Sequence, residues 1–257
     1  MGGAVVLHRR VDGPPDAPAV VLLHGGGSRG ATWDRFTPAL LAAGHRVVVP
    51  DLRGHAGSPR SSSYTLEHHR DDVLALLDQL GLDRVTLVGH SLGGFAATLV
   101  AQEQPARVTR LVLEDPPAPP RLGSAGRLPL GRLLLLSIGT ADPRRRYDRL
   151  ALTSAITQLR QARPAWWDAL PRITAPTLLL SGGPGSHIAP ARLAEVAALI
   201  PRCDLVTVPV GHRVHSTAPD EFRRTVMNFL GDAVRDGTSA PTSPASPLDG
   251  AVREEQP

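Results

Sequence analysis

The chain contains no lysine and almost no cysteine. Its single cysteine, Cys203, cannot form an internal disulfide, and there is no cysteine cluster to hold a metal. Because all the basic residues are arginine, few groups titrate between histidine and arginine, and a net charge of +4 moves the pI to about 10.4. Apart from Arg144-Arg145-Arg146 the arginines form no basic stripe, which argues against a nucleic-acid partner.

Long apolar segments and aromatic residues are also scarce. The longest apolar run, Leu133 to Ile138, is far shorter than the roughly 20 residues that span a bilayer. The N-terminus lacks the basic segment and apolar run of a signal peptide. We therefore expect a cytoplasmic protein, monomeric or homodimeric, that acts on a small molecule and not on a membrane. With 4% aromatic residues, its core must be mainly aliphatic.

Short apolar runs alternate with helical patterns along most of the chain. Runs rich in valine and leucine without polar alternation predict strands that are covered on both faces of a parallel sheet. The predicted strands are Val5–Leu7, Ala19–Leu23, Arg46–Pro50, Val85–Val88, Leu111–Glu114, Thr177–Leu180 and Leu205–Val208. The predicted helices are Thr32–Ala43, Leu66–Leu80, Ser91–Gln104, Ala191–Ile200 and Pro219–Leu230. This order predicts one α/β domain with right-handed crossovers.

Two segments interrupt the alternation and define the domain organisation. Residues 116–175 show no strand pattern, and they begin with four prolines among five residues. Helical fragments at Leu128–Ser137 and Tyr147–Gln161 favour an insertion over one end of the sheet. Residues 236–257 are rich in Ser, Thr, Pro and Ala, and we expect them to be disordered. Residues 1–115 and 176–235 then form the core domain.

The sequence Gly89-His90-Ser91-Leu92-Gly93 matches the pattern G-x-S-x-G between a predicted strand and a predicted helix. In that context the serine occupies a strained turn, from which its hydroxyl projects beyond the strand end. Side chains two positions away would collide, so Gly89 and Gly93 are required. The helix that follows directs its first N–H groups toward developing negative charge. We predict that Ser91 is a nucleophile; the alternative is an ordinary glycine-rich turn.

A second glycine-rich segment, His24-Gly25-Gly26-Gly27, follows the predicted strand Ala19–Leu23. It resembles the oxyanion loop of esterases and lipases. The resemblance implies that the amides of Gly26 and Leu92 bind an oxyanion, with Gly25 or Gly27 as alternatives to Gly26. A simple turn is the other interpretation.

With these motifs in place, the sequence resembles an α/β-hydrolase with a helical lid, from Val5 to about Leu230. The segments Asp51-Leu52-Arg53-Gly54-His55 and Gly211-His212 agree with that family. The resemblance implies a mostly parallel central sheet with helices on both faces. It also implies a Ser, acid, His order along the chain, and neither a cofactor nor a metal ion.

His212, in the loop after the last predicted strand, resembles the family's catalytic histidine, and we predict that it is the general base. His215 is the alternative. We interpret His8, His45, His68 and His69 as solvated surface residues. We expect His55 to brace a turn and His90 to form part of the pocket wall.

The catalytic acid departs from the usual family pattern. Gly185 stands at the aligned position, and the loop Ser181–His187 contains no carboxylate. Some family members place the acid one strand earlier, where this chain has Glu114-Asp115. Because side chains alternate along a strand, only one of the two is expected to point into the site. We predict Asp115, with Glu114 as the alternative; a solvated strand end and a dyad would be the remaining interpretation.

The motifs together predict a serine hydrolase that cleaves a carboxylic ester, thioester or lactone through an acyl-enzyme. Apolar residues of the insertion, including Trp166 and Trp167, suggest an apolar acyl or alkyl pocket, although most of them would also pack the lid onto the core. The alternatives are C–C bond hydrolysis, a cyclisation, or a non-catalytic ligand-binding protein on the same scaffold.

Overall fold

The computed structural model describes residues 3–123 and 147–236, which form a seven-stranded sheet. The strands are β1 (Arg9–Asp12), β2 (Ala19–Leu23), β3 (Arg46–Pro50), β4 (Val85–His90), β5 (Val108–Glu114), β6 (Thr177–Ser181) and β7 (Cys203–Thr207). Their order across the sheet is β1-β3-β2-β4-β5-β6-β7. Only β1 is antiparallel to its neighbour, and the other pairs are parallel. The predicted fold class is therefore confirmed.

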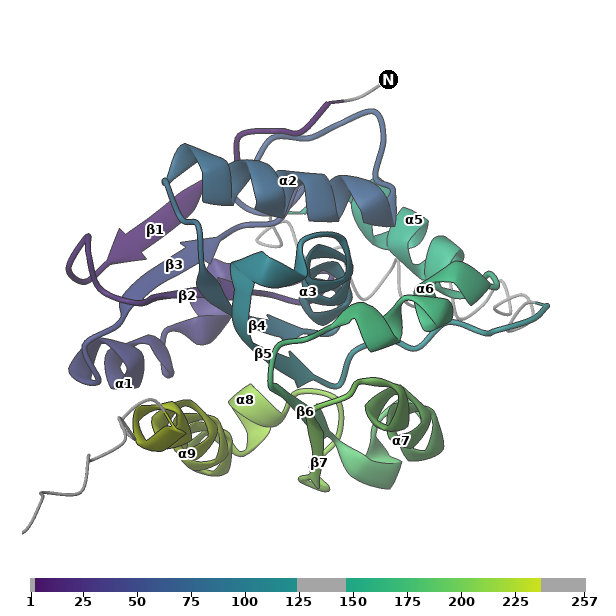
Figure 1. Cartoon of the computed structure of the whole chain (residues 1–257). Coiled ribbons are helices and arrows are strands. Elements are labelled where there is room, and N and C mark those ends of the chain that lie inside the picture. The colour runs from purple at the N-terminus through teal and green to yellow at the C-terminus, as the bar shows by residue number, and fades with distance from the viewer. Residues whose placement is uncertain (1–2, 124–146, 237–257) are drawn as a thin grey trace, which may run out of the picture.

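Helices cover both faces of the sheet (Figure 1). They are α1 (Thr37–Ala42), α2 (Leu66–Gln79), α3 (Leu92–Glu103), α5 (Arg149–Leu159), α6 (Pro164–Asp168), α7 (Pro190–Leu199), α8 (Val214–Thr217) and α9 (Pro219–Asp236). Short 3-10 turns lie at Gly30–Trp33, Pro105–Arg107, Leu170–Arg172 and Gly183–Gly185. Within the described ranges, no helix combines the length and apolarity that crossing a bilayer requires.

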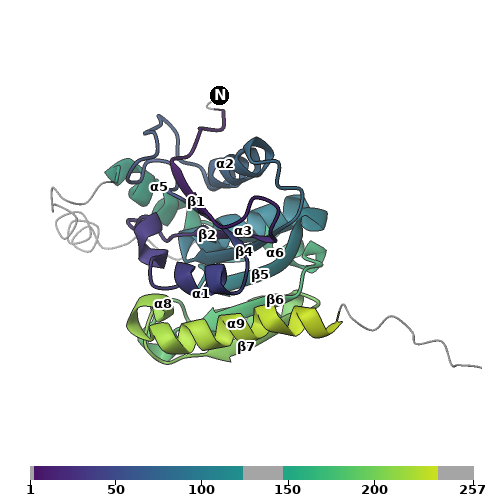
Figure 2. The ribbon, with the colours of Figure 1, turned by 90° about the vertical axis from the view of Figure 1, so that its left-hand side faces the viewer.

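The central strands bury side chains on both faces, as their continuous apolar runs predict. Every residue of β2, β4 and β6 is buried. Alternate residues of one strand enter different cores: Val21 packs with α2 and α3, whereas Val20 packs with α1 and α9. Figure 2 shows α1 and α9 side by side on the second face. The aliphatic core that the composition predicts is thus divided into two layers.

The first strand differs from its prediction. It lies at Arg9–Asp12 and not at Val5–Leu7. Leu7 is buried, but Val6 is 63% exposed, and the Val5 N–H donates to Asp72. As an edge strand, β1 pairs with β3 on one side only, and its other side is not covered by a neighbouring strand. The backbone hydrogen bonds to β3 therefore form even though the side chains of β1 are mostly polar.

Most predicted helices agree with the structure to within a few residues, with two exceptions. The predicted helix Thr32–Ala43 divides into the 3-10 turn Gly30–Trp33 and the helix α1, which has Pro38 in its first turn. The last helix continues beyond Leu230 to Asp236. The predicted helix Leu128–Ser137 and the predicted disordered tail from residue 237 onward lie outside the described residues.

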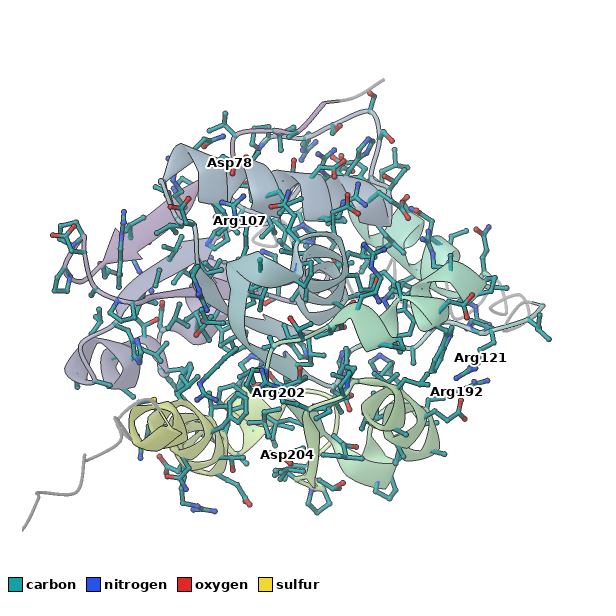
Figure 3. The ribbon with its side chains drawn as sticks, viewed as in Figure 1. Asp78, Arg107, Arg121, Arg192, Arg202 and Asp204 are labelled. Carbon is teal, nitrogen blue, oxygen red and sulfur yellow. The ribbon has the colours of Figure 1, made fainter. Side chains whose placement is uncertain are left out.

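The two tryptophans of the insertion pack into the first core layer, so packing and not a pocket accounts for them. Trp166 stacks on Phe95 with ring centroids 5.2 Å apart, and its indole N–H donates to Thr98. The Trp167 indole N–H donates to the carbonyl of Pro119. At the surface, Arg107 and Asp78 point toward one another and form an ion pair of 2.6 Å (Figure 3). Exposed pairs of this kind contribute little stability.

Candidate active site

Ser91 occupies the turn between β4 and α3 in a strained conformation. Its φ of 49° and ψ of −118° are unusual for a residue with a side chain. Two backbone hydrogen bonds hold this conformation: the Ser91 N–H donates to the Glu114 carbonyl, and the Phe95 N–H donates to the Ser91 carbonyl, both at 2.9 Å. The Ser91 hydroxyl makes no capping bond to α3. It is therefore not used to close the helix and remains available for chemistry.

The glycines of the G-x-S-x-G pattern are required by close backbone contact. A Cβ on Gly89 would lie 2.6 Å from backbone atoms of Gly93. A Cβ on Gly93 would lie 2.6 Å from the His24 carbonyl oxygen. Both distances are shorter than real Cβ contacts. The turn at Ser91 therefore packs against the predicted oxyanion loop as well as against itself.

Asp115 and His212 are in direct contact. Asp115 follows β5 immediately, its side chain is fully buried, and its Oδ2 lies 2.6 Å from His212 Nδ1. Its φ of 46° turns the chain at the strand end, and its N–H donates to the Leu180 carbonyl. A buried carboxylate at this distance favours the tautomer with the proton on Nδ1, which leaves Nε2 free as a base.

The loop after β6 supplies hydrogen-bond donors to Asp115 in place of the missing acid. The Gly182 N–H donates to Asp115 Oδ1 at 2.9 Å, and the Ser186 hydroxyl donates to Oδ2. Gly185, where the family usually has the acid, lies against Gly211 in the histidine loop. Sequence reasoning missed Ser186, and its only signal was a hydroxyl in a loop that lacked a carboxylate. These donors satisfy the buried carboxylate oxygens of Asp115 without bringing a second charge into the site.

Glu114 and His215, the two alternatives, pair with each other. Glu114 Oε2 lies 2.7 Å from His215 Nδ1, and Oε1 accepts the His215 main-chain N–H at 2.8 Å. Although burial opposes ionisation, His90 and the hydrogen bonds from His215 lower the pKa of Glu114. Glu114 and Asp115 are both fully buried, so the interpretation as a solvated strand end is wrong.

His90 connects the nucleophile turn to the histidine loop. Its Nε2 lies 3.0 Å from the His212 carbonyl, and the two rings are 4.7 Å apart. Burial lowers the pKa of His90 to about 4, so the ring is neutral near pH 7 and its Nε2–H donates to that carbonyl. His90 precedes Ser91 directly, so this contact places His212 beside the nucleophile turn.

The predicted oxyanion loop lies against the start of α3. A Cβ on Gly26 would be 3.6 Å from Leu92 Cδ2, so Gly26 and Leu92 are neighbours. His55 accepts the Gly27 N–H at 3.0 Å and contacts the Arg53 carbonyl at 2.9 Å, which confirms that it braces a turn. Leu152 of α5 covers Gly26, since its Cδ1 is 3.1 Å from the same Cβ position.

Of the histidines expected at the solvated surface, His69 is buried instead, whereas His8 is exposed as predicted. His69 is 1% exposed, and burial lowers its pKa to about 3. His8 is exposed, but it contacts the Asp51 carboxylate at 3.0 Å. The exposed His187 lies over His212, with ring centroids 3.9 Å apart; partial desolvation and His212 lower the pKa of His187. His187 therefore covers the ring of His212 with a ring whose neutral form is favoured.

One group of potential metal ligands occurs among the described residues. His90, Glu114 and His215 offer ligand atoms within 4.8 Å of one another, and all three are buried. However, Glu114 and His215 stand at hydrogen-bond distance from each other, and His90 Nε2 is directed to the His212 carbonyl. The other nitrogen of His90 lies against Gly25. The geometry is that of a hydrogen-bonded cluster.

Comparison with known proteins shows to which family the chain belongs. The family model described as the alpha/beta hydrolase fold matches residues 18–134. The sn-1-specific diacylglycerol lipase ABHD11 of Mus musculus is 31% identical over 255 residues, covering 86% of this chain and 83% of that protein. The chain belongs to the α/β-hydrolase fold family. As a member of this family, it is an enzyme with hydrolase activity.

Other α/β hydrolases are similar over most of this chain. The pimeloyl-[acyl-carrier protein] methyl ester esterase of Aromatoleum aromaticum is 32% identical, over 79% of this chain and 94% of the esterase. The crystal structure of the enol-lactonase from Burkholderia xenovorans LB400 superposes with a TM-score of 0.73 at 26% identity, over 88% of this chain and 96% of that one.

Proposed function

We propose that this α/β hydrolase cleaves a carboxylic ester, thioester or lactone through an acyl-enzyme on Ser91. The observation that carries the proposal is the buried contact between Asp115 and His212, beside the strained turn that presents Ser91. A carboxylate with a purely structural role would not require an imidazole partner at the carboxyl ends of the strands. A base that must become an imidazolium during the reaction does need a buried anion behind it.

In the proposed reaction, Ser91 Oγ attacks the carbonyl carbon while His212 Nε2 accepts the hydroxyl proton. The negative charge on the carbonyl oxygen is bound by the amides of Gly26 and Leu92, two residues that are neighbours in the structure. His212 then gives the proton to the leaving oxygen or sulfur as the bond to carbon breaks. A water molecule, deprotonated by His212, then attacks the Ser91 ester. His212 returns that proton to Ser91 Oγ as the ester bond breaks and the acid is released. Asp115 stabilises the imidazolium in both steps.

The substrate class follows from the side chains over the oxyanion loop. Leu152 covers Gly26 and, with the ring of Tyr147, approaches Gly27. Both residues belong to the predicted insertion 116–175, which we propose acts as a lid on the core domain. An aliphatic and an aromatic side chain at this place favour an apolar acyl or alkyl group next to the reacting carbonyl. Relatives named as a lipase, an esterase and an enol-lactonase support ester or lactone chemistry.

Labelling with a fluorophosphonate probe tests the proposal directly. We expect a single adduct on Ser91 in the wild type and none in Ser91→Ala. Ser216→Ala is the matched control, since Ser216 is an exposed serine near His212. A nitrophenyl ester series of increasing chain length and a vinylogous diketone then separate ester cleavage from C–C cleavage. A wild-type protein that is folded but neither labelled nor active on any ester would refute the proposal.

A further inference from the structure

Next to the proposed triad lies a second chain of carboxylate, imidazole and hydroxyl. Glu114 Oε2 is 2.7 Å from His215 Nδ1, and His215 Nε2 is 2.7 Å from Thr32 Oγ1. The order of groups repeats that of Asp115, His212 and Ser91. Unlike Ser91, Thr32 lies after the glycine-rich loop, in the turn Gly30–Trp33. Nothing in the proposed reaction uses these three residues.

Burial and charge fix the direction of the hydrogen bonds in this chain. The Glu114 side chain is fully buried and that of His215 is 2% exposed. Because an ionised Glu114 only accepts, His215 Nδ1 carries a proton that it donates to Glu114. With the proton on Nδ1, Nε2 of His215 can accept a hydrogen bond from the Thr32 hydroxyl. Trp33, with its ring 4.6 Å from that of His215, closes one side of the chain.

Glu114 also holds the backbone that carries His212. Its Oε1 accepts the His215 main-chain N–H in the first turn of α8, which begins two residues after His212. From the other side, His90 donates to the His212 carbonyl. Glu114 and Asp115 are consecutive in the sequence, so the end of β5 holds the histidine loop at two points, His212 and His215.

At Thr32, the hydrogen-bonded series Glu114–His215–Thr32 reaches the segment that carries the predicted oxyanion amides. Thr32 is six residues after Gly26, and its N–H donates to the Arg29 carbonyl within the same turn. A shift of His215 would therefore move both the His212 loop and the loop that begins at His24. Displacements of this kind, of about 1 Å, cost on the order of 100-fold in rate.

We propose that Glu114, His215 and Thr32 are positioning residues of this hydrolase. They set the distance between the His212 loop and the oxyanion loop without touching the substrate. The inference rests on the proposed function, because it assigns these residues to the reaction of Ser91. A positioning role lowers kcat and leaves KM nearly unchanged, since the substrate pocket itself is not altered.

Three substitutions test the proposal by steady-state kinetics on a nitrophenyl ester. Glu114→Gln keeps the size of the side chain and removes the anion, and we expect kcat to fall about 10- to 100-fold with KM within about twofold. Thr32→Val should lower kcat about 10-fold, and Thr32→Ser, which restores the hydroxyl, should recover most of it. Glu195→Gln, on the exposed side of α7, is the control.

Several results would overturn the proposal. They are a folded Glu114→Gln variant with wild-type kcat, an effect on KM alone, or equal losses in Thr32→Val and Thr32→Ser. If Glu114→Gln does not fold, the two Thr32 variants decide, because they alter one hydroxyl at the half-buried end of the chain.

Proton NMR separates this inference from the proposed function. Strongly hydrogen-bonded imidazole protons resonate far downfield, and we expect two such signals. Asp115→Asn should remove the His212 signal, and Glu114→Gln should remove the His215 signal. If the His215 signal survives in Glu114→Gln, the positioning chain is refuted. If the wild type shows both signals but no reaction at Ser91, the proposed function fails while the hydrogen-bond chain stands.

Discussion

Acidification should destabilise this protein strongly, because three of its histidines are buried as neutral rings. Burial lowers the pKa of His24 and of His69 to about 3 and that of His90 to about 4. In the unfolded chain each ring has a pKa of about 6.5. Below that pH the unfolded state binds more protons than the folded state, so stability is present at neutral pH and is lost as the pH falls.

The size of the effect follows from the gap between pH and the unfolded pKa. At pH 5 the gap is about 1.5 units, and one unit is worth about 1.4 kcal/mol, so each ring costs about 2 kcal/mol. Together the three rings cost about 6 kcal/mol at pH 5, against a typical total stability of about 5–15 kcal/mol. The estimate requires only that each ring stays neutral at pH 5 in the folded protein.

His69 allows a clean test of this reasoning. It lies on the buried face of α2, and neither ring nitrogen has a hydrogen-bond partner among the described residues. His69→Leu therefore removes a titrating group without breaking a hydrogen bond. We expect unchanged or higher stability near pH 7.5, and a loss between pH 7.5 and pH 5 that is about 2 kcal/mol smaller than in the wild type.

Urea unfolding followed by circular dichroism at the two pH values measures both quantities. The control is His45→Leu, at a site where the histidine makes an exposed contact to the Pro18 carbonyl. This variant should keep the wild-type dependence on pH. If His69→Leu and the wild type lose the same free energy of unfolding, then His69 is not a neutral buried ring, and the reasoning is refuted.

Three further predictions concern the site. Asp115→Asn should lower kcat on the ester substrate about 10⁴-fold, because the amide imposes the wrong imidazole tautomer; wild-type turnover would exclude Asp115 as the acid. Leu152→Ala should open space over Gly26 and shift the preferred acyl chain toward longer groups in a kcat/KM series, and an unchanged preference would remove Leu152 from the pocket. Tyr147→Phe should raise the free energy of unfolding by about 1 kcal/mol in urea titrations, because the buried Tyr147 hydroxyl has no hydrogen-bond partner among the described residues; a loss of stability would show that the hydroxyl is satisfied.

The central sheet was predictable because its strands carry a strong signal. Strands covered on both faces need continuous apolar residues, and β2, β4 and β6 show them in the sequence. The nucleophile turn was predictable for a related reason, since Gly89 and Gly93 mark places where backbone segments touch. Both signals arise from local steric demands, which a single sequence records directly.

What escaped prediction depends on contacts between distant segments. Strand β1 forms from polar residues because one side of an edge strand faces solvent. His69 continues the apolar face of Leu66 and Val73 at helical spacing, and that position was the available signal for its burial. The sequence also favoured one carboxylate of the pair Glu114 and Asp115, whereas the fold uses both, each for a different histidine.

Asp115 directly follows β5, next to β4 in the sheet, so the proposed acid lies one strand away from the loop after β6, where the family usually has it. That loop donates to Asp115 through the Gly182 N–H and the Ser186 hydroxyl, and Gly185 still faces the histidine loop at Gly211. In this protein, position 185 therefore remains a place where a carboxylate could lie next to the histidine loop. Because β5 and β6 are parallel neighbours, an acid at the end of either strand would face the same histidine loop.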